Sequence, residues 1–186
     1  MGRNVEIKAR ISDATDVSRR AAALSGSQGR RIDQQDTFFP CRKGRLKLRA
    51  FTDGSGQLIF YDRPDVRGPK TSEFSLAPTS DAESLCDVLG QALGVRAVVR
   101  KVRRLYLVGQ TRVHIDQVEG LGEFLELEVV LDEGQTESEG AAIAAQLMEW
   151  LAVDETQLVH GAYVDLIESA HQSDEQLDNA SASGKL

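Results

Sequence analysis

The sequence predicts an α+β fold, in which roughly eight antiparallel strands form a β-barrel or tunnel with a charged interior and with helices packed outside. Two observations lead to this prediction. Several short segments alternate charged and apolar residues, most regularly Arg45–Arg49, and successive residues of a strand point to opposite faces. Between these segments stand amphipathic stretches with helix-capping signals, which can cover the apolar faces while the charged faces converge on the other side.

The first half of the chain predicts five strands and one helix. Residues 3–11 alternate and predict a strand, after which Ser12-Asp13 offers a helix N-cap and Gly26 a stop. Asp53–Gly56 has the composition of a hairpin turn, and Pro64–Pro69 that of a loop. The remaining strands of this half are expected at residues 34–40, 45–51, 57–63 and 70–76.

The second half predicts three more strands and three helices. Ser80 and Glu83 have the spacing of a capping box, which predicts a helix that ends near Gly94. Thr136 and Glu139 repeat this spacing and open a second helix. Its inward residues are expected to be Ile143, Leu147 and either Trp150 or Leu151. Strands are expected at residues 98–108, 111–118 and 124–131, and a last short helix at residues 162–170.

Length and composition indicate one domain, residues 1–171, and a tail at residues 172–186 that we expect to be disordered, because almost nothing in it is apolar. No apolar run is long enough to cross a bilayer, so we expect a cytoplasmic protein without a membrane partner. The net charge of −7 argues against nucleic acid as a partner. A homodimer is compatible with helices on the outside of a wide sheet.

The charged strand faces are where we expect the chemistry. A row such as Arg45, Lys47 and Arg49 places like charges about 7 Å apart, so it repels itself unless water screens it or a polyanion fills it. On a single strand a solvated surface is the usual explanation, but basic faces on several strands favour a polyanion. The basic residues on these faces are Lys8, Arg10, Arg45, Lys47, Arg49, Arg63, Lys70, Lys101, Arg103 and Arg112.

Carboxylates gather on the first and last strands of the predicted barrel. If these two strands close the barrel side by side, Glu6, Glu126 and Glu128 meet among the cations. Mg²⁺ prefers a few carboxylates together with water and phosphate oxygens, while Arg and Lys can hold the remaining phosphate charge. A metal and cations around a polyphosphate form the usual arrangement for phosphoryl chemistry.

Three polar residues near these faces are open to more than one interpretation. His114 shares a strand face with Asp116. We expect that carboxylate to orient the imidazole, although a base or a nucleobase contact stays an alternative. Tyr61 and Tyr163 are expected to pack in the barrel or against a helix rather than to take part in catalysis.

With these residues the chain resembles the CYTH proteins, or triphosphate tunnel metalloenzymes, whose signature is an N-terminal Glu-x-Glu-x-Lys strand in a tunnel of charged side chains. The resemblance extends from Asn4 to about Ile167. The first glutamate of the signature is Asn4 here, so either the other three glutamates suffice for the metal or metal affinity and activity are reduced. Within this family the chain most resembles the class IV adenylate cyclase branch. The residues that carry this likeness are Lys101-x-Arg103, Gly109, Asp116, Gly120-Leu121-Gly122-x-Phe124 and Glu126-x-Glu128.

The resemblance implies Mg²⁺ or Mn²⁺ as the cofactor and a small-molecule triphosphate as the substrate. The metal ligands that it implies are Glu6, Glu126 and Glu128, with Asp116 as an additional one. The phosphate ligands that it implies are Lys8, Arg49, Arg63, Lys101 and Arg103, of which Lys8 and Arg103 are our candidates for catalysis. The strand faces add Lys47 and Arg112 as substrate-binding residues, followed by Arg10 and Arg45.

Three functions follow from this. The leading one is an adenylate cyclase, which converts ATP to cyclic AMP and pyrophosphate by attack of the 3′-hydroxyl on the α-phosphorus. The second is a triphosphatase that hydrolyses inorganic triphosphate, thiamine triphosphate or a nucleoside triphosphate in the same site. The third is a polyphosphate or nucleotide-binding module without catalysis, which the neutral Asn4 makes credible. No side chain stands out in the sequence as the general base.

Overall fold

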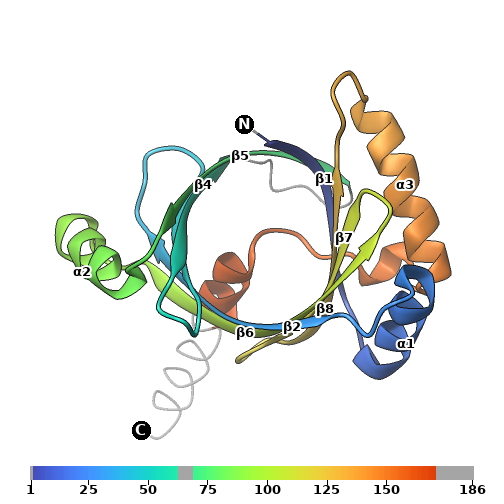
Figure 1. Cartoon of the computed structure of the whole chain (residues 1–186), viewed down its shortest axis with the longest axis horizontal. Coiled ribbons are helices and arrows are strands. Elements are labelled where there is room, and N and C mark those ends of the chain that lie inside the picture. Colours follow the sequence, from blue (N-terminus) through green and yellow to red (C-terminus); the bar gives the residue numbers. More distant parts are fainter. Residues whose placement is uncertain (1, 63–68, 171–186) are drawn as a thin grey trace, which may run out of the picture.

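The computed structural model describes residues 2–62 and 69–170. Eight strands close into an antiparallel barrel in the order β1-β5-β4-β3-β2-β6-β7-β8, with β8 hydrogen-bonded to β1 (Figure 1). The predicted fold class is therefore confirmed, as is the pairing of the first and last strands. The strands are β1 (Gly2–Arg10), β2 (Arg30–Phe39), β3 (Arg45–Ala50), β4 (Gly56–Asp62), β5 (Lys70–Thr79), β6 (Ala97–Val108), β7 (Thr111–Val118) and β8 (Gly122–Val130).

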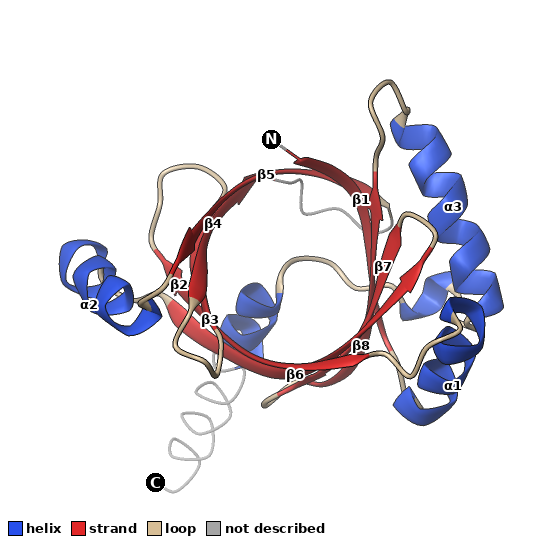
Figure 2. Ribbon diagram, viewed as in Figure 1, coloured by secondary structure: helices blue, strands red, loops and turns tan. Residues whose placement is uncertain are grey.

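Helices lie outside this barrel on two sides (Figure 2). α1 (Ala14–Ser25) and α3 (Glu137–Trp150) cover one side, formed by β1, β6, β7 and β8, whereas α2 (Ala82–Leu93) lies against β2 and β3. After the short 3₁₀ helix η1 (Glu155–Gln157), the chain crosses to one end of the barrel and forms a helix over residues 163–170. This last helix is seen through the ring of strands in Figure 2.

The apolar residues form two clusters with different positions. The first lies outside the strands, where Val5, Leu127 and Leu147 belong to the core between β1, β8 and α3. Gly140 permits the close approach of α3, because a Cβ atom there would lie 2.7 Å from Val5 Cγ2. The second cluster lies inside the barrel at one end and closes it. Its buried members are Phe38, Ile59, Tyr61, Val99, Val118, Phe124, Ala162, Tyr163 and Val164.

Three details of the predicted elements are wrong, the first being the end of the strand predicted at 70–76, which continues to Thr79. β2 begins at Arg30, four residues before the predicted start, because Arg30–Asp33 pair with the far half of β6. The cap of α2 is Asp81, whose carboxylate accepts from the backbone N–H of Ser84 at 3.0 Å. The strand β5 runs to Thr79, so the first helical turn starts one residue later than a cap at Ser80 would require.

Other details agree with the sequence. Thr136 and Glu139 form the predicted reciprocal capping box of α3. Leu147 and Leu151 are buried there, whereas Trp150 is half exposed. Arg63, residues 64–68 of the predicted loop, and the predicted tail at residues 172–186 lie outside the described residues. No helix within residues 2–62 and 69–170 has the length and apolar character needed to cross a membrane.

Candidate active site

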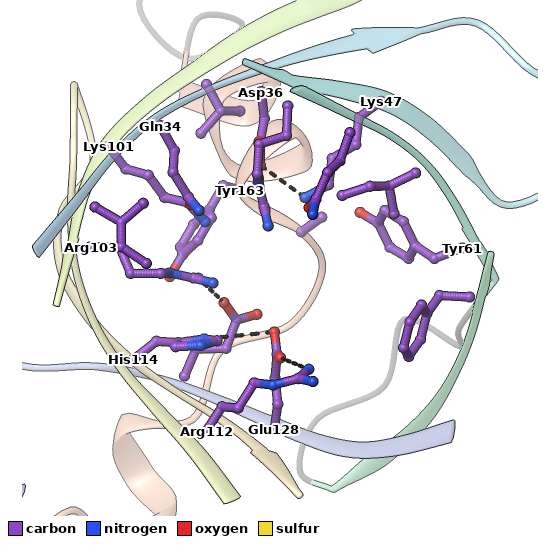
Figure 3. Close-up of a pocket in the computed structure, with 18 of the residues that line it drawn as sticks. Gln34, Asp36, Lys47, Tyr61, Lys101, Arg103, Arg112, His114, Glu128 and Tyr163 are labelled. Carbon is purple, nitrogen blue, oxygen red and sulfur yellow. Dashed lines mark hydrogen bonds and ion pairs between the residues drawn. The ribbon is translucent and has the colours of Figure 1, made fainter. Parts of the chain in front are cut away.

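The inward side chains of all eight strands surround a cavity of about 350 Å³ (Figure 3). Most of the side chains in its middle are charged or polar, although most of them are buried. The sequence places them there because alternate residues of each strand face inward. The polar and charged lining residues are Asn4, Glu6, Lys8, Arg30, Gln34, Asp36, Lys47, Arg49, Gln57, Ser72, Lys101, Arg103, Arg112, His114, Glu126 and Glu128.

Asp36 holds two of the predicted substrate-binding cations. Its carboxylate accepts two hydrogen bonds from Arg49, at 2.8 and 3.0 Å, and one from Lys47 Nζ at 2.8 Å. Burial opposes the charge on Asp36, but Arg49 and Lys47 outweigh it and hold the pKa of Asp36 well below its usual range. Burial also lowers the pKa of Lys47 to about 7, against the attraction of Asp36.

Asp116 is the centre of a second buried network. Arg103 binds it in bidentate fashion, with N–O distances of 2.7 and 2.6 Å, and Lys101 Nζ lies 3.4 Å away. The hydroxyl of Tyr163 donates to the same carboxylate at 3.0 Å. Burial opposes the charge on Asp116, but Arg103 and Lys101 outweigh it, so its pKa is lowered. Because both oxygens of Asp116 already accept hydrogen bonds, this carboxylate holds Arg103 and Lys101 in position.

Glu126 connects this network to the first strand. Arg103 Nη2 donates to Glu126 Oε2 at 2.6 Å, and Lys8 Nζ lies 3.6 Å from Oε1. Lys8 also stands 3.8 Å from the centre of the Tyr163 ring, a cation–π contact. Burial would raise the pKa of Glu126, but Lys8 and Arg103 hold it well below its usual range. The acid is therefore ionised at neutral pH.

Glu128 and His114 lie beside Glu126. Glu128 pairs with Glu6 across β1 and β8, and His114 pairs with Glu126 across β7 and β8. His114, Glu126 and Glu128 each offer one ligand atom within 4.8 Å of the others. Burial, followed by the charge of Arg103, lowers the pKa of His114 to about 4. The imidazole is thus neutral at pH 7, the form that binds metals.

These residues fit a divalent cation on the donor chemistry alone. Two ionised carboxylates and a neutral imidazole are metal ligands. Asn4 lines the same cavity, and its side-chain oxygen is buried without a hydrogen-bond partner. Glu6 lines the same cavity opposite Glu128, although it does not join the three-residue group.

The two ends of the cavity differ. The apolar cluster around Phe38 and Tyr163 closes one end. At the other end Arg112 is 44% exposed and Leu76 is 45% exposed, so this end is open to solvent. The strand register places Leu105 there, opposite Arg30. The apolar residues that line the cavity toward this mouth are Ile32, Phe51, Leu76 and Leu105.

The structure brings together nearly all of the predicted site residues. Lys8, Lys47, Arg49, Lys101, Arg103, Arg112, Glu6, Glu126 and Glu128 line the cavity, and Asp116 supports Arg103 from behind. Arg10 is exposed and donates to the carbonyl of Leu121 at 2.6 Å, while Arg45 pairs with Asp165 at 2.8 Å. Arg63 lies outside the described residues.

Sequence reasoning missed several of the lining residues, and two of them, Asp36 and Tyr163, make the contacts described above. On its own strand face Asp36 stands between Gln34 and Phe38, which are neutral, so no charged row marks it. Only its position two residues after Gln34 on that face could have indicated it. Tyr163 was expected to pack, and it does contact Phe124 edge-on, but its hydroxyl also reaches Asp116. Asp36 and Asp116 offset part of the positive charge around them. Among the described residues the cations still outnumber the carboxylates: Lys8, Arg30, Lys47, Arg49, Lys101, Arg103 and Arg112 against Glu6, Asp36, Asp116, Glu126 and Glu128.

Comparisons with known proteins agree with this architecture. Residues 2–163 match the model of the CYTH domain family. The chain is 25% identical to MJ0240 of Methanocaldococcus jannaschii, provisionally named an adenylate cyclase, over 87% of this chain and 97% of that protein. It is 30% identical to adenylate cyclase CyaB of Aeromonas hydrophila, over 69% and 70%. The structure of PH1012 from Pyrococcus horikoshii OT3 superposes with a TM-score of 0.79 at 22% identity, over 88% and 98%.

Proposed function

The chain belongs to the CYTH domain family, and from this premise we propose that it is a metal-dependent enzyme acting on a triphosphate in the tunnel, with cyclisation of ATP to cyclic AMP and pyrophosphate as its reaction. The names of the relatives from M. jannaschii and A. hydrophila support the class IV adenylate cyclase branch. The observation that carries the proposal is the set of buried cations around one cavity with a single open mouth.

The cations are held in position before any substrate arrives. Arg49 uses one edge of its guanidinium on Asp36. Arg103 uses Nε and Nη2 on Asp116 and Glu126. A guanidinium has further N–H donors. Such pre-organised donors stabilise charge that develops on phosphate oxygens without reorganising during the reaction. We assign the β- and γ-phosphates to the deep part of the tunnel, next to Lys8, Lys47, Arg49, Lys101 and Arg103.

The open mouth favours a substrate with an organic group over inorganic triphosphate. Ile32, Phe51 and Leu105 provide apolar and aromatic surface there, on which a nucleobase can stack. With the pyrophosphate portion inside and the nucleoside at the mouth, the α-phosphorus lies between them, near Glu126 and Glu128. A divalent ion bound by these carboxylates would add Lewis-acid stabilisation of the phosphate charge.

The reaction balances without a covalent enzyme intermediate. The 3′-hydroxyl oxygen bonds to the α-phosphorus, the bond from that phosphorus to the bridging oxygen of the β-phosphate breaks, and pyrophosphate leaves. The hydroxyl proton passes to solvent or to a phosphate oxygen. The part of this chain is to bind and orient the triphosphate and to stabilise the leaving pyrophosphate, chiefly through Lys8 and Arg103.

Product analysis tests this proposal. Pure protein is incubated with ATP and either Mg²⁺ or Mn²⁺, and the nucleotides and phosphates are separated by chromatography. Cyclic AMP with pyrophosphate supports the cyclase, whereas ADP with orthophosphate would show a triphosphatase. If ATP gives neither set of products, and inorganic triphosphate and thiamine triphosphate are not hydrolysed either, the result supports a binding module without catalysis. Arg49→Met should lose most of the turnover and the exposed Arg19→Met should keep it, which excludes a contaminating enzyme.

A further inference from the structure

His114 is buried in the tunnel without a hydrogen-bond partner for its Nδ1 atom. Its side chain is only 4% exposed, and Nδ1 lies 3.6 Å from Glu128 Oε1, which is beyond hydrogen-bonding distance. A buried polar atom without a partner costs about 1–3 kcal/mol. Such a cost is usually offset by a ligand, an ion or water, so we expect one of these to contact His114 Nδ1.

Orientation by Asp116, as the sequence suggested, does not account for this histidine. The carboxylate of Asp116 is occupied by Arg103, Lys101 and Tyr163, and no hydrogen bond joins it to His114 within the described residues. The strand register instead makes Glu126 the direct cross-strand neighbour of His114. Figure 3 shows the imidazole and the Glu128 carboxylate facing each other in the cavity.

His114, Glu126 and Glu128 have the geometry of a three-residue metal site. Their ligand atoms lie within 4.8 Å of one another, and no other group of three His, Cys, Asp or Glu residues does so within residues 2–62 and 69–170. The two arginines at this site contact the Oε2 atoms, Arg103 on Glu126 and Arg112 on Glu128. Lys8 Nζ lies 3.6 Å from Glu126 Oε1, beyond hydrogen-bonding distance. An ion bound at Glu128 Oε1 would therefore meet the imidazole rather than a guanidinium.

We propose that His114 is a direct metal ligand together with Glu126 and Glu128, and that the site consequently selects Mn²⁺ over Mg²⁺. Mg²⁺ takes oxygen ligands and keeps much of its water. Imidazole nitrogen suits transition metals instead, and carboxylates suit Mn²⁺ as well. A site with one nitrogen and two carboxylate ligands is thus better matched to Mn²⁺ than to Mg²⁺. The inference rests on the proposed function only in placing a divalent ion beside the phosphates.

Pulsed electron paramagnetic resonance of the full chain loaded with Mn²⁺ tests the ligand directly. A coordinated imidazole produces nitrogen coupling on the Mn²⁺ signal, and labelling the histidines with ¹⁵N should change that coupling. This measurement needs no variant. A Mn²⁺ signal without nitrogen coupling, or a protein that binds no Mn²⁺, would overturn the assignment.

Variants then identify the histidine. His114→Gln should abolish the nitrogen coupling and lower Mn²⁺ affinity in calorimetry by about tenfold or more, since even the outer-shell partners of metal ligands cost this much. Its Mg²⁺ affinity should change far less. The exposed His160→Gln is the matched control and should keep both the coupling and the affinity. Coupling that survives His114→Gln would contradict the proposal.

The outcomes separate this inference from the proposed function. If Mn²⁺ binds without nitrogen coupling and the protein turns over ATP, the proposed enzyme function is supported and only the role of His114 as a metal ligand is wrong. Nitrogen coupling without turnover would support the metal ligand and count against the enzyme.

Discussion

Lys47 Nζ lies 2.8 Å from Asp36 Oδ2, and this ion pair is buried in the middle of the tunnel. Burial lowers the pKa of Lys47 to about 7 even though Asp36 opposes the shift. A cation that is half neutral at physiological pH responds to a bound polyanion, because the new negative charge raises its pKa again. We therefore expect the binding of a triphosphate in the tunnel to be coupled to proton binding at Lys47.

Triphosphate binding should take up protons at pH 8. Free Lys47 is mostly neutral there, because its pKa is about 7, whereas the complex holds it protonated. At pH 6 the lysine is already charged and the uptake should be small, so affinity should fall as the pH rises above about 7. Calorimetry in buffers of different ionisation enthalpy measures the uptake. Lys47→Arg should reduce it, and the exposed Lys43→Arg should not.

Asp36→Asn should destabilise the protein more than a surface change on the same strand. The substitution leaves Lys47 and Arg49 buried without their carboxylate, and breaking a buried pair in this way typically costs roughly 3–5 kcal/mol. Urea unfolding measures the loss, with the exposed Asp33→Asn as control. Added triphosphate should recover part of the stability. Equal losses for the two variants would show that Asp36 does not neutralise the tunnel cations.

Triphosphate should raise the melting temperature more than phosphate does, because it contacts more of the tunnel cations at once. A ligand at a hundredfold excess over its Kd stabilises the folded state by about 2.7 kcal/mol, which is a shift of several degrees for a domain of this size. Arg49→Met should reduce the shift and Arg19→Met should not. Equal shifts for triphosphate, phosphate and sulfate at matched ionic strength would rule out a polyphosphate site.

Asn4→Glu should tighten divalent binding. Asn4 is 4% exposed, lines the cavity and has an unpaired side-chain oxygen, so a glutamate there adds a negative charge near Glu6. Calorimetric titration with Mn²⁺ measures the change. Asn4→Gln lengthens the side chain without the charge and serves as control. An affinity that is the same in both variants would place position 4 away from the ion.

The corrected cap of α2 can be checked by stability alone. Asp81→Ala removes the oxygen that accepts from Ser84 N, and loss of an N-cap costs about 1 kcal/mol. Ser80→Ala should change the free energy of unfolding by much less. Thermal or urea unfolding compares the two. A larger loss of stability for Ser80→Ala would show that Ser80 is the cap, as the spacing of Ser80 and Glu83 predicts.

Much of this fold was accessible from local sequence pattern. Polar and apolar residues alternate from Arg112 to Asp116, and the predicted strand at 111–118 has the bounds of β7. The capping box at Thr136 and Glu139 is as predicted. The predicted boundaries were wrong where strand pairing decided them, as at Arg30, because residues 30–33 pair with β6. The family resemblance rested on short charged motifs and is confirmed by the match over residues 2–163.

The sequence by itself determined which side chains face the interior, because the alternation of a strand is a local property of the backbone. It also brought Glu6 next to Glu128, once the first and last strands were taken as neighbours. Only the tertiary structure decided which charges meet. Asp36 reaches Arg49 through the pairing of β2 with β3, and Tyr163 reaches Asp116 from 47 positions away. Such contacts depend on strand order and register across the whole barrel, which no short stretch of sequence encodes.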